Sequence, residues 1–365
     1  MTSSSLTLIE LNAGDASERD WIRFLLSDFR LEVIRAPDFS VIRPGALYSI
    51  YNHRRLSLPA DFLEKISGAE GCGLLHLGDE RFSGDFRIYG SFSYVIRNSA
   101  AAHLEGPGLL NVPIGYSNDL PDLPFIPASR RRYLWSFAGG RRPWRTAMAA
   151  CFADIDPHLL SLPDTQKGET HISRGEYCSA MADSVFVPCG EGNVTLETVR
   201  PYEALEYGAI PLLPRRALGD MYRTALGPHP LPSFSSWKEA AAFVRTLRCD
   251  PSRLDRLQQE TQEWWRERKS AWPKAVSGFI RRHAAGEGRP GLKQRFGDWN
   301  NGLYQPRRMT ELLRQQSIGQ VAGRLVRLAS SAGRRQPQNA GVWGLSSPPS
   351  AQPEAEKPVL PVRRG

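Results

Sequence analysis

The sequence predicts an α/β protein with two domains, each built on a mostly parallel β-sheet. Three observations lead to this class. Short apolar runs alternate with helical patterns along most of the chain, which is typical of strand–helix–strand units. A proline-rich segment near residue 120 divides these units into two groups. At roughly 150 residues per domain, the 365 residues are enough for about two domains.

The predicted N-terminal domain, residues 1–120, contains short strands between helices or loops. The expected strands cover residues 6–11, 46–51, 73–77 and 93–97, and the expected helices cover residues 18–27 and 61–67. The domain ends in the segment NDLPDLPFIPASRRR, which starts at Asn118 and has three prolines within seven residues. Such a proline-dense segment is typical of a connection between domains.

The predicted C-terminal domain, residues 121–285, has a clearer alternation of strands and helices. The expected strands cover residues 133–137, 184–188 and 209–213, and the expected helices cover residues 144–152, 176–183, 195–207, 237–248 and 254–285. Repeated units of this kind imply right-handed crossovers and a parallel sheet with helices on both faces. Ligands of such sheets bind at the carboxyl ends of the strands, so we expect the functional residues there.

The net charge of +9 comes almost entirely from the C-terminal part of the chain. Residues 286–365 contain 13 basic and 5 acidic residues, whereas residues 1–285 contain 34 basic and 33 acidic residues. We predict a basic helical extension over residues 286–332 and a disordered tail over residues 333–365, which is rich in Pro, Ser, Gln and Ala. Docking of the amphipathic part on the protein's own surface is preferred over a membrane-bound helix, because two glycines weaken an isolated helix.

Composition also bears on the location of the protein. No apolar run approaches the roughly 18 residues of a membrane span, and the N-terminus has no basic region or cleavage site of a signal peptide. The five cysteines are odd in number and lack CxxC spacing, which indicates free thiols in a reducing compartment. We therefore expect a cytoplasmic protein, with residues 286–335 as the segment for any peripheral contact with the inner membrane.

The most informative stretch is DSVFVPCGEGNVTLETVRPYEALEYGAIPLLP, residues 183–214. It predicts a strand, a glycine-containing loop and a helix whose N-terminal N–H groups suit a diphosphate. Arg200 adds a guanidinium for phosphate oxygens, and Glu203 can accept hydrogen bonds from the two hydroxyls of a ribose. An ion pair of Arg200 with Glu197 or Glu203 on one helix face is the alternative, and the residues alone leave both open.

The same stretch resembles a known family. VRPYEALEYGAIPLL is similar to the exostosin-type glycosyltransferase signature Arg-x-x-Glu-Ala-x-x-x-Gly-x-Ile-Pro-Val. Three further pieces resemble that family's donor domain: SVFVPCGEG, the helix at residues 177–181, and RRRYLWSFAGGRRPWR at residues 130–145. The pieces HLGDE, YVIRN and VPIGY look like the ribitol xylosyltransferase branch, which is the closest branch. The resemblance covers roughly residues 70–250.

The resemblance implies a GT-B fold, in which two Rossmann-like domains face a cleft. The N-terminal domain would bind the acceptor, a glycan, a polyol phosphate or a lipid-linked intermediate, and the C-terminal domain would bind a UDP-sugar such as UDP-xylose. The long helix from Leu254 would return across the domain interface. The residues implied on the donor side are Arg145 and Arg200 for the diphosphate, Glu203 for the ribose, and Gly139, Gly190 and Glu197 beside them.

The family inverts the anomeric centre, so the enzyme needs a base for the acceptor hydroxyl. Asp79 and Glu80 follow the apolar strand GLLHL and are the candidate catalytic residues, although Gly78-Asp79-Glu80 also reads as an ordinary turn. His53 is a weaker candidate. The resemblance implies no cofactor besides the UDP-sugar co-substrate and no metal ion.

The pair Asp154 and Asp156 forms a DxD sequence, which in another glycosyltransferase fold holds Mn²⁺. A solvated loop is the preferred interpretation here, because the pair lies between a helix and Pro157. The charge of residues 286–365 leaves one alternative from another class of protein: a non-catalytic protein that binds nucleic acid or a membrane through its C-terminus. No nucleic-acid partner is expected for the glycosyltransferase.

Overall fold

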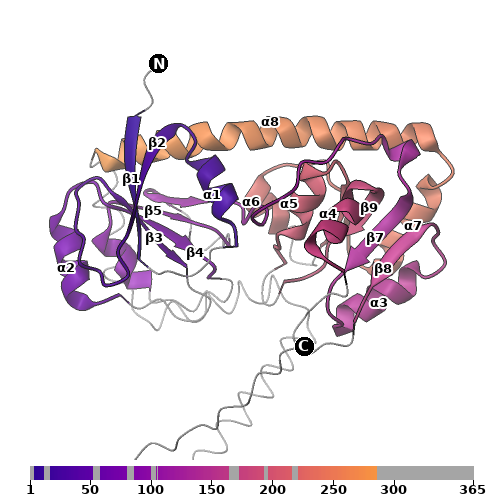
Figure 1. The fold of residues 1–365 in the computed structure, drawn as a ribbon, viewed down its shortest axis with the longest axis horizontal. Helices are drawn as coiled ribbons and strands as arrows, with labels where there is room; N and C mark the ends of the chain where they lie inside the picture. Colours follow the sequence, from indigo (N-terminus) through magenta and orange to yellow (C-terminus); the bar gives the residue numbers. More distant parts are fainter. Residues whose placement is uncertain are drawn as a thin grey trace, which may run out of the picture. The chain divides into compact units, whose positions relative to one another are not determined.

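The protein contains two parallel β-sheets, one formed by residues before the proline-rich segment and one by residues after it (Figure 1). The first has the strand order β2-β1-β3-β4-β5-β6, with β1 (Ser4–Glu10), β2 (Phe29–Arg35), β3 (Leu47–Tyr51), β4 (Gly73–Leu77), β5 (Tyr94–Arg97) and β6 (Leu109–Asn111). The second has the order β11-β10-β9-β7-β8, with β7 (Tyr133–Ala138), β8 (His158–Ser161), β9 (Ser184–Pro188), β10 (Ile210–Pro214) and β11 (Ser233–Phe234). Every pair of neighbouring strands is parallel, which confirms the predicted α/β class with two Rossmann-like halves.

This computed structural model describes residues 4–11, 17–51, 58–79, 86–99, 104, 106–163, 172–192, 196–215 and 221–285. All of them belong to one compact unit, Met1–Val321. The predicted basic extension (residues 286–332) and tail (residues 333–365) lie outside the described residues. The helices are α1 (Arg19–Leu25), α2 (Ala60–Gly68), α3 (Pro143–Phe152), α4 (Arg174–Ala182), α5 (Arg200–Glu206), α6 (Met221–Leu226), α7 (Trp237–Leu247) and α8 (Pro251–Ala284), with 3₁₀ turns η1 (Phe86–Ser91) and η3 (Ala128–Arg130).

Most predicted elements lie close to their predicted bounds. Strands 73–77 and 184–188 match residue for residue, and the other predicted elements, apart from one helix, differ by at most three residues at either end. The exception is the helix predicted over 195–207, which begins only at Arg200, because Pro201 favours the first turn of a helix. The helix is therefore seven residues long, and residues 196–199 before it are not helical.

The apolar faces of both sheets are covered by helices. In the first half, α2 and η1 pack on one face around Phe62 and Ile66, and α1 packs on the other through the fully buried Trp21. In the second half, α3 and α7 cover one face and α4 and α5 cover the other. The carboxyl ends of the strands are left for the loops, which is where ligands of parallel sheets bind.

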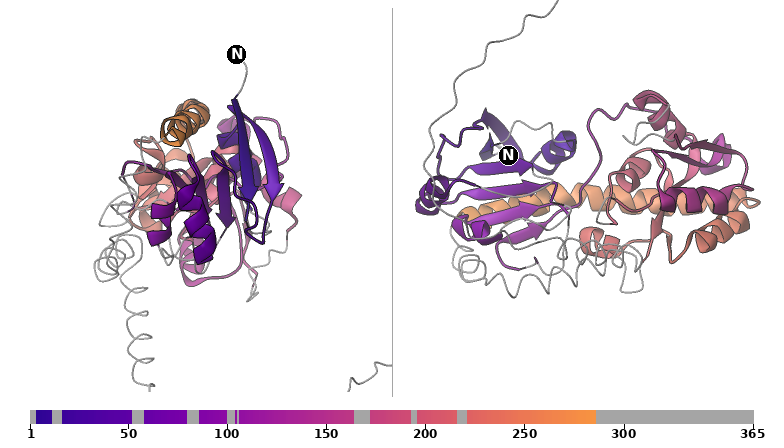
Figure 2. Two further views of the ribbon diagram at one scale, coloured as in Figure 1. Left: turned by 90° about the vertical axis from the view of Figure 1, so that its left-hand side faces the viewer. Right: turned by 90° about the horizontal axis from the view of Figure 1, so that it is seen from below.

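Helix α8 contacts both halves of the protein, as predicted for the long C-terminal helix. It is drawn in orange and runs beside both sheets in Figures 1 and 2. On the second half, Gln262 Nε2 donates to the Leu205 carbonyl (2.9 Å). On the first half, Ser277 Oγ donates to Asp28 Oδ2 (2.8 Å), and Phe279 meets the Tyr94 ring edge-on. One core cluster continues through α8 from one half to the other.

Two further expectations concern cysteines and membranes. All five cysteines are free, as predicted, and Cys72, Cys178 and Cys189 are buried. Among the helices that the structure describes, none combines the length and the apolar character needed to cross a bilayer.

Gly73 begins β4 at a position where a side chain has no room. An alanine Cβ there would lie 2.2 Å from Cζ of Tyr94, whose ring is fully buried against Phe279. We expect Gly73→Ala to lower the free energy of unfolding by about 1–3 kcal/mol, the usual cost of overpacking a core. Urea-unfolding midpoints test this, with Gly68→Ala as the control, because a Cβ at Gly68 meets nothing within 4 Å. Equal midpoints for the two variants would contradict the prediction.

Candidate functional site

The centre of the candidate site is the loop that follows β7. The strand ends at Ala138, two glycines follow, and α3 starts at Pro143 because proline is preorganised for the first helical turn. Two arginines from different elements meet here. Arg145 lies on the first turns of α3, and Arg200 is the first residue of α5.

Both guanidinium groups are fixed by backbone carbonyls and by one aromatic ring. Arg145 Nη1 donates to the Gly140 carbonyl (2.6 Å), and Arg200 Nη2 donates to the Ala138 carbonyl (2.7 Å). Their Cζ atoms lie 5.6 and 4.1 Å from the centroid of the Phe137 ring, respectively. The two guanidinium groups therefore lie against the same ring at the end of β7.

Neither arginine has a carboxylate partner within the part of the chain that the structure describes. The alternative ion pair of Arg200 with Glu197 or Glu203 does not form, although all three residues are described. Nε of Arg145 is buried and has no hydrogen-bond partner among the described residues. Burial, together with the neighbouring charges of Arg200 and Arg142, lowers the pKa of Arg145 to about 10. An anion bound here would reverse that shift, so the pair has the electrostatics of an anion site.

Glu203 lies one turn after Arg200 on α5 and is 1% exposed. Its Oε1 accepts hydrogen bonds from Arg174 Nη1 (3.1 Å) and from the Ser117 hydroxyl, and its Oε2 accepts one from the Tyr177 hydroxyl (2.7 Å). Burial raises the pKa of Tyr177 well above its usual value, so this phenol stays a donor. Three donors therefore satisfy the buried Glu203 carboxylate in this structure.

The predicted ligand Glu197 is buried and serves a contact between distant segments. Its Oε1 accepts hydrogen bonds from the Ile114 backbone N–H (2.9 Å) and the Tyr202 hydroxyl (2.5 Å). The first contact ties the segment after β6 to the segment before α5. In this structure the Glu197 carboxylate thus links two segments that lie 83 residues apart in the chain.

The two predicted glycines are both close to aromatic or cationic side chains of α3. A Cβ on Gly139 would lie 2.9 Å from Arg145 Nη1, and a Cβ on Gly190 would lie 1.9 Å from Cζ3 of Trp144. Glycine is needed at position 190 because the Trp144 ring lies against its backbone. The resemblance implies a place for Gly190 beside the diphosphate ligands, and in this structure an indole lies against it.

Asp79 lies at the carboxyl end of the first sheet, two residues beyond β4. Its Oδ2 pairs with Nη2 of Arg97 on β5 at 3.4 Å, and the two side chains are 5% and 0% exposed. Gly78 before it has a positive φ of 77°, and its N–H donates to Asn98 Oδ1 (2.9 Å). The other candidates for the base, Glu80 and His53, lie outside the described residues.

The two carboxylates of the DxD sequence point to different partners. Asp154 Oδ1 pairs with Arg245 Nη2 at 2.5 Å, whereas Asp156 Oδ1 pairs with His158 Nδ1 at 2.9 Å. Both side chains are exposed, which agrees with the solvated-loop interpretation. Among the residues placed by the structure, no group of three or more His, Cys, Asp or Glu side chains can hold a metal ion.

Arg174 and Ser117 were not predicted as functional residues. One signal in the sequence does locate Arg174: Ser173 and Glu176 form a capping box, and Arg174 is the first residue of the helix that it starts. Ser117 carries no such signal, because it is 86 residues from Glu203 in the chain.

Comparison with known proteins gives structural likeness only. No protein-family model matches the chain, and no curated protein matches it. Among solved structures, an α1,3-fucosyltransferase aligns with a TM-score of 0.46 and 12% identity, over 78% of this chain and 91% of that chain. The β-glucosyltransferase of phage T4, in complex with UDP and Mn²⁺, aligns with a TM-score of 0.43 and 10% identity, over 76% of this chain and 99% of that chain. A mutant of the phage enzyme in complex with UDP-glucose gives a TM-score of 0.44 and 10% identity, over 76% and 99% of the two chains. Identities of this size establish no shared activity.

Proposed function

We propose that the protein is an inverting GT-B glycosyltransferase that moves a sugar from a UDP-sugar to a glycan, polyol-phosphate or lipid-linked acceptor. One observation carries the proposal: Arg145 and Arg200 converge at the end of β7 without a carboxylate partner in the described structure. The exostosin-type motifs, which are closest to the ribitol xylosyltransferase branch, support a UDP-sugar as the donor and make UDP-xylose the first donor to test.

In this proposal the arginine pair binds the diphosphate. Each guanidinium donates one N–H to a carbonyl, which leaves its other N–H groups for phosphate oxygens. When the acceptor oxygen attacks the anomeric carbon, the bond to the diphosphate breaks and negative charge grows on the leaving oxygen. Two fixed cations stabilise that charge more than they stabilise the ground state, which lowers the barrier. Transfer without a metal ion is part of the proposal.

Glu203 is the proposed ligand of the ribose hydroxyls, next to the diphosphate on α5. For the acceptor proton we propose the dipeptide Asp79-Glu80. Asp79 is already paired with Arg97, so the role of base is assigned to Glu80.

Binding of UDP tests the donor site. We expect Arg200→Ala to bind UDP about 10- to 150-fold more weakly than the parent, equivalent to the loss of about 1.5–3 kcal/mol from hydrogen bonds to a charged group. Isothermal titration calorimetry measures the affinity, and Arg256→Ala, an exposed arginine of α8, is the matched control. If Arg200→Ala and the parent bind UDP with equal affinity, the assignment of Arg200 to the diphosphate site is wrong. The affinities of the parent for UDP-xylose and UDP-glucose are then compared to identify the sugar donor.

The alternative function is the binding of nucleic acid or a membrane through residues 286–365. These residues, including the segment 286–335 predicted to contact the membrane, lie outside the described part of the chain. The alternative function, the membrane contact and the cytoplasmic location stay predictions.

A further inference from the structure

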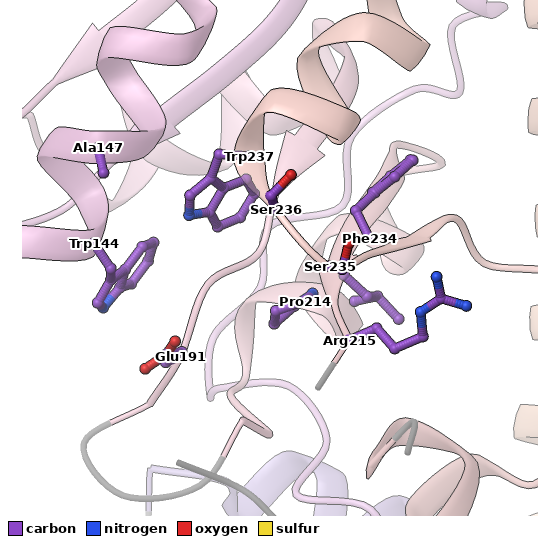
Figure 3. Close-up of a pocket in the computed structure, with 10 residues that line it drawn as sticks. Trp144, Ala147, Glu191, Pro214, Arg215, Phe234, Ser235, Ser236 and Trp237 are labelled. Carbon is purple, nitrogen blue, oxygen red and sulfur yellow. The ribbon is translucent and has the colours of Figure 1, made fainter. Parts of the chain in front are cut away.

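A pocket opens at the carboxyl ends of β10 and β11, between the starts of α3 and α7 (Figure 3). Its volume is about 270 Å³, and it is lined by Trp144, Ala147, Glu191, Leu213, Pro214, Arg215, Phe234, Ser235, Ser236 and Trp237. None of these residues belongs to the arginine pair or to the Glu203 network. This volume is slightly below the usual range of small-molecule sites, so the pocket suits a ligand with one ring.

One wall of the pocket is formed by two tryptophans, and each of them packs against a phenylalanine of the core. The indoles of Trp144 and Trp237 lie nearly parallel, with centroids 6.1 Å apart and an angle of 20° between the rings. Trp144 also meets Phe137 edge-on at 5.9 Å, and Trp237 meets Phe152 edge-on at 6.4 Å. Because the two indoles contact each other, a ligand meets their outer surface and does not enter between them.

Besides apolar residues such as Leu213 and Phe234, the pocket is lined by polar side chains, and two of these are preorganised. Ser235 and Ser236 are fixed by Glu239 on the first turn of α7: Ser235 Oγ donates to Glu239 Oε2 (2.7 Å), and Ser236 Oγ accepts from the Glu239 N–H (3.2 Å). Figure 3 shows Glu191 near the Trp144 ring and Arg215 at the opposite end of the pocket. The charges of Glu191 and Arg215 balance, so the pocket does not favour a phosphate.

An apolar aromatic wall beside carboxylate, guanidinium and hydroxyl groups matches the chemistry of a sugar ring. A pyranose has one face of C–H groups, which packs on indole, and a rim of hydroxyls, which need both donors and acceptors. The pocket also adjoins the proposed donor site, because the Arg145 guanidinium lies 5.0 Å from the Trp144 ring centroid. We propose that this pocket binds one neutral sugar ring of the glycan acceptor, so that the acceptor would reach from the N-terminal half, where the resemblance places it, onto the C-terminal half. The proposal rests on the proposed function in identifying that glycan as the acceptor.

Saturation-transfer difference NMR on the full chain tests the pocket. The probes are methyl β-D-xylopyranoside and methyl β-D-glucopyranoside, with uridine as a separate probe. Ala147 is exposed on α3 and lines the pocket, so Ala147→Trp fills it, whereas Ala150→Trp places the same ring on the same helix away from the pocket. We expect at least one glycoside to bind the parent and Ala150→Trp alike, and to bind Ala147→Trp at least tenfold more weakly.

The same variants separate this inference from the proposed function. UDP should bind Ala147→Trp as it binds the parent, and the glycoside should bind Arg200→Ala as it binds the parent. If the parent binds UDP but neither glycoside, the sugar pocket is wrong and the donor site stands. If the parent binds a glycoside but not UDP, the donor site is wrong and the pocket stands. If Ala147→Trp loses uridine and UDP instead of the glycoside, the pocket is a nucleoside site and the inference is overturned.

Discussion

Replacing Asp79 with alanine is expected to lower the free energy of unfolding by about 3–5 kcal/mol, which is the usual cost of removing one partner of a buried ion pair. Arg97 is fully buried on β5, and its Nη2 lies 3.4 Å from Asp79 Oδ2. The guanidinium cannot reach bulk water when the carboxylate is lost. The charge therefore stays in a medium of low polarity without this partner.

The matched control is Asp61→Ala. Asp61 also pairs with a cation, Lys65, at 3.7 Å, but both side chains are mostly exposed. Such surface pairs contribute about 0–1 kcal/mol, so the control should unfold at nearly the parent's urea concentration. A fall of less than 1 kcal/mol for Asp79→Ala would show that the pair is not buried as described. Turnover numbers of Asp79→Asn and Glu80→Gln then distinguish the two roles. If Glu80 is the base and Asp79 is structural, Glu80→Gln should lose more turnover than Asp79→Asn.

Glu197→Ala should lower the free energy of unfolding by about 3–6 kcal/mol, because two buried donors lose a charged acceptor at about 1.5–3 kcal/mol each. These donors are the Ile114 N–H and the Tyr202 hydroxyl, both bound to Oε1. Urea unfolding measures the loss. Glu263→Ala is the control, because Glu263 is exposed on α8 and bonds only Gln259 among the described residues.

The sequence suggested Glu197 as a donor ligand, and UDP titration of Glu197→Gln distinguishes that role from the structural one. The amide keeps an oxygen for the two donors, so this variant should remain folded. We expect it to bind UDP as the parent does. A variant of parental stability that no longer binds UDP would restore Glu197 to the donor site.

The strands that could be predicted from the sequence are those buried on both faces. All five residues of β4 and all five of β9 are buried, so each reads as a continuous apolar run with sharp limits. β2 was missed because it is an edge strand: charged side chains such as Arg30 and Glu32 lie among its apolar ones, and Val33 is 50% exposed. β6, β8 and β11 have four residues or fewer and, unlike the equally short β5, are not buried along their whole length, so they give no continuous apolar run.

Arg200 could be predicted from the residues themselves, because it lies near the start of a helix that follows a buried strand, whereas Arg145 was implied only by the family resemblance. The hydrogen-bond partners of Glu197 and Glu203 could not be predicted. Glu197 binds a backbone group 83 residues away, and Glu203 binds a side chain 86 residues away. Whether a carboxylate on α5 meets a ligand or another part of the chain depends on packing between segments that no local pattern encodes.

The contacts of α8 set the order in which the protein can be completed during synthesis. Residues of the first half contact residues of α8 that are synthesised much later: Asp28 accepts a hydrogen bond from Ser277, 249 residues further along, and Tyr94 on β5 packs against Phe279. At about 5–20 residues per second, a ribosome needs roughly 10–35 s to pass from β6 to the end of α8. During that time the N-terminal half exposes apolar side chains that only the last helix covers, so a nascent chain stopped before α8 should be a substrate for chaperones and proteases.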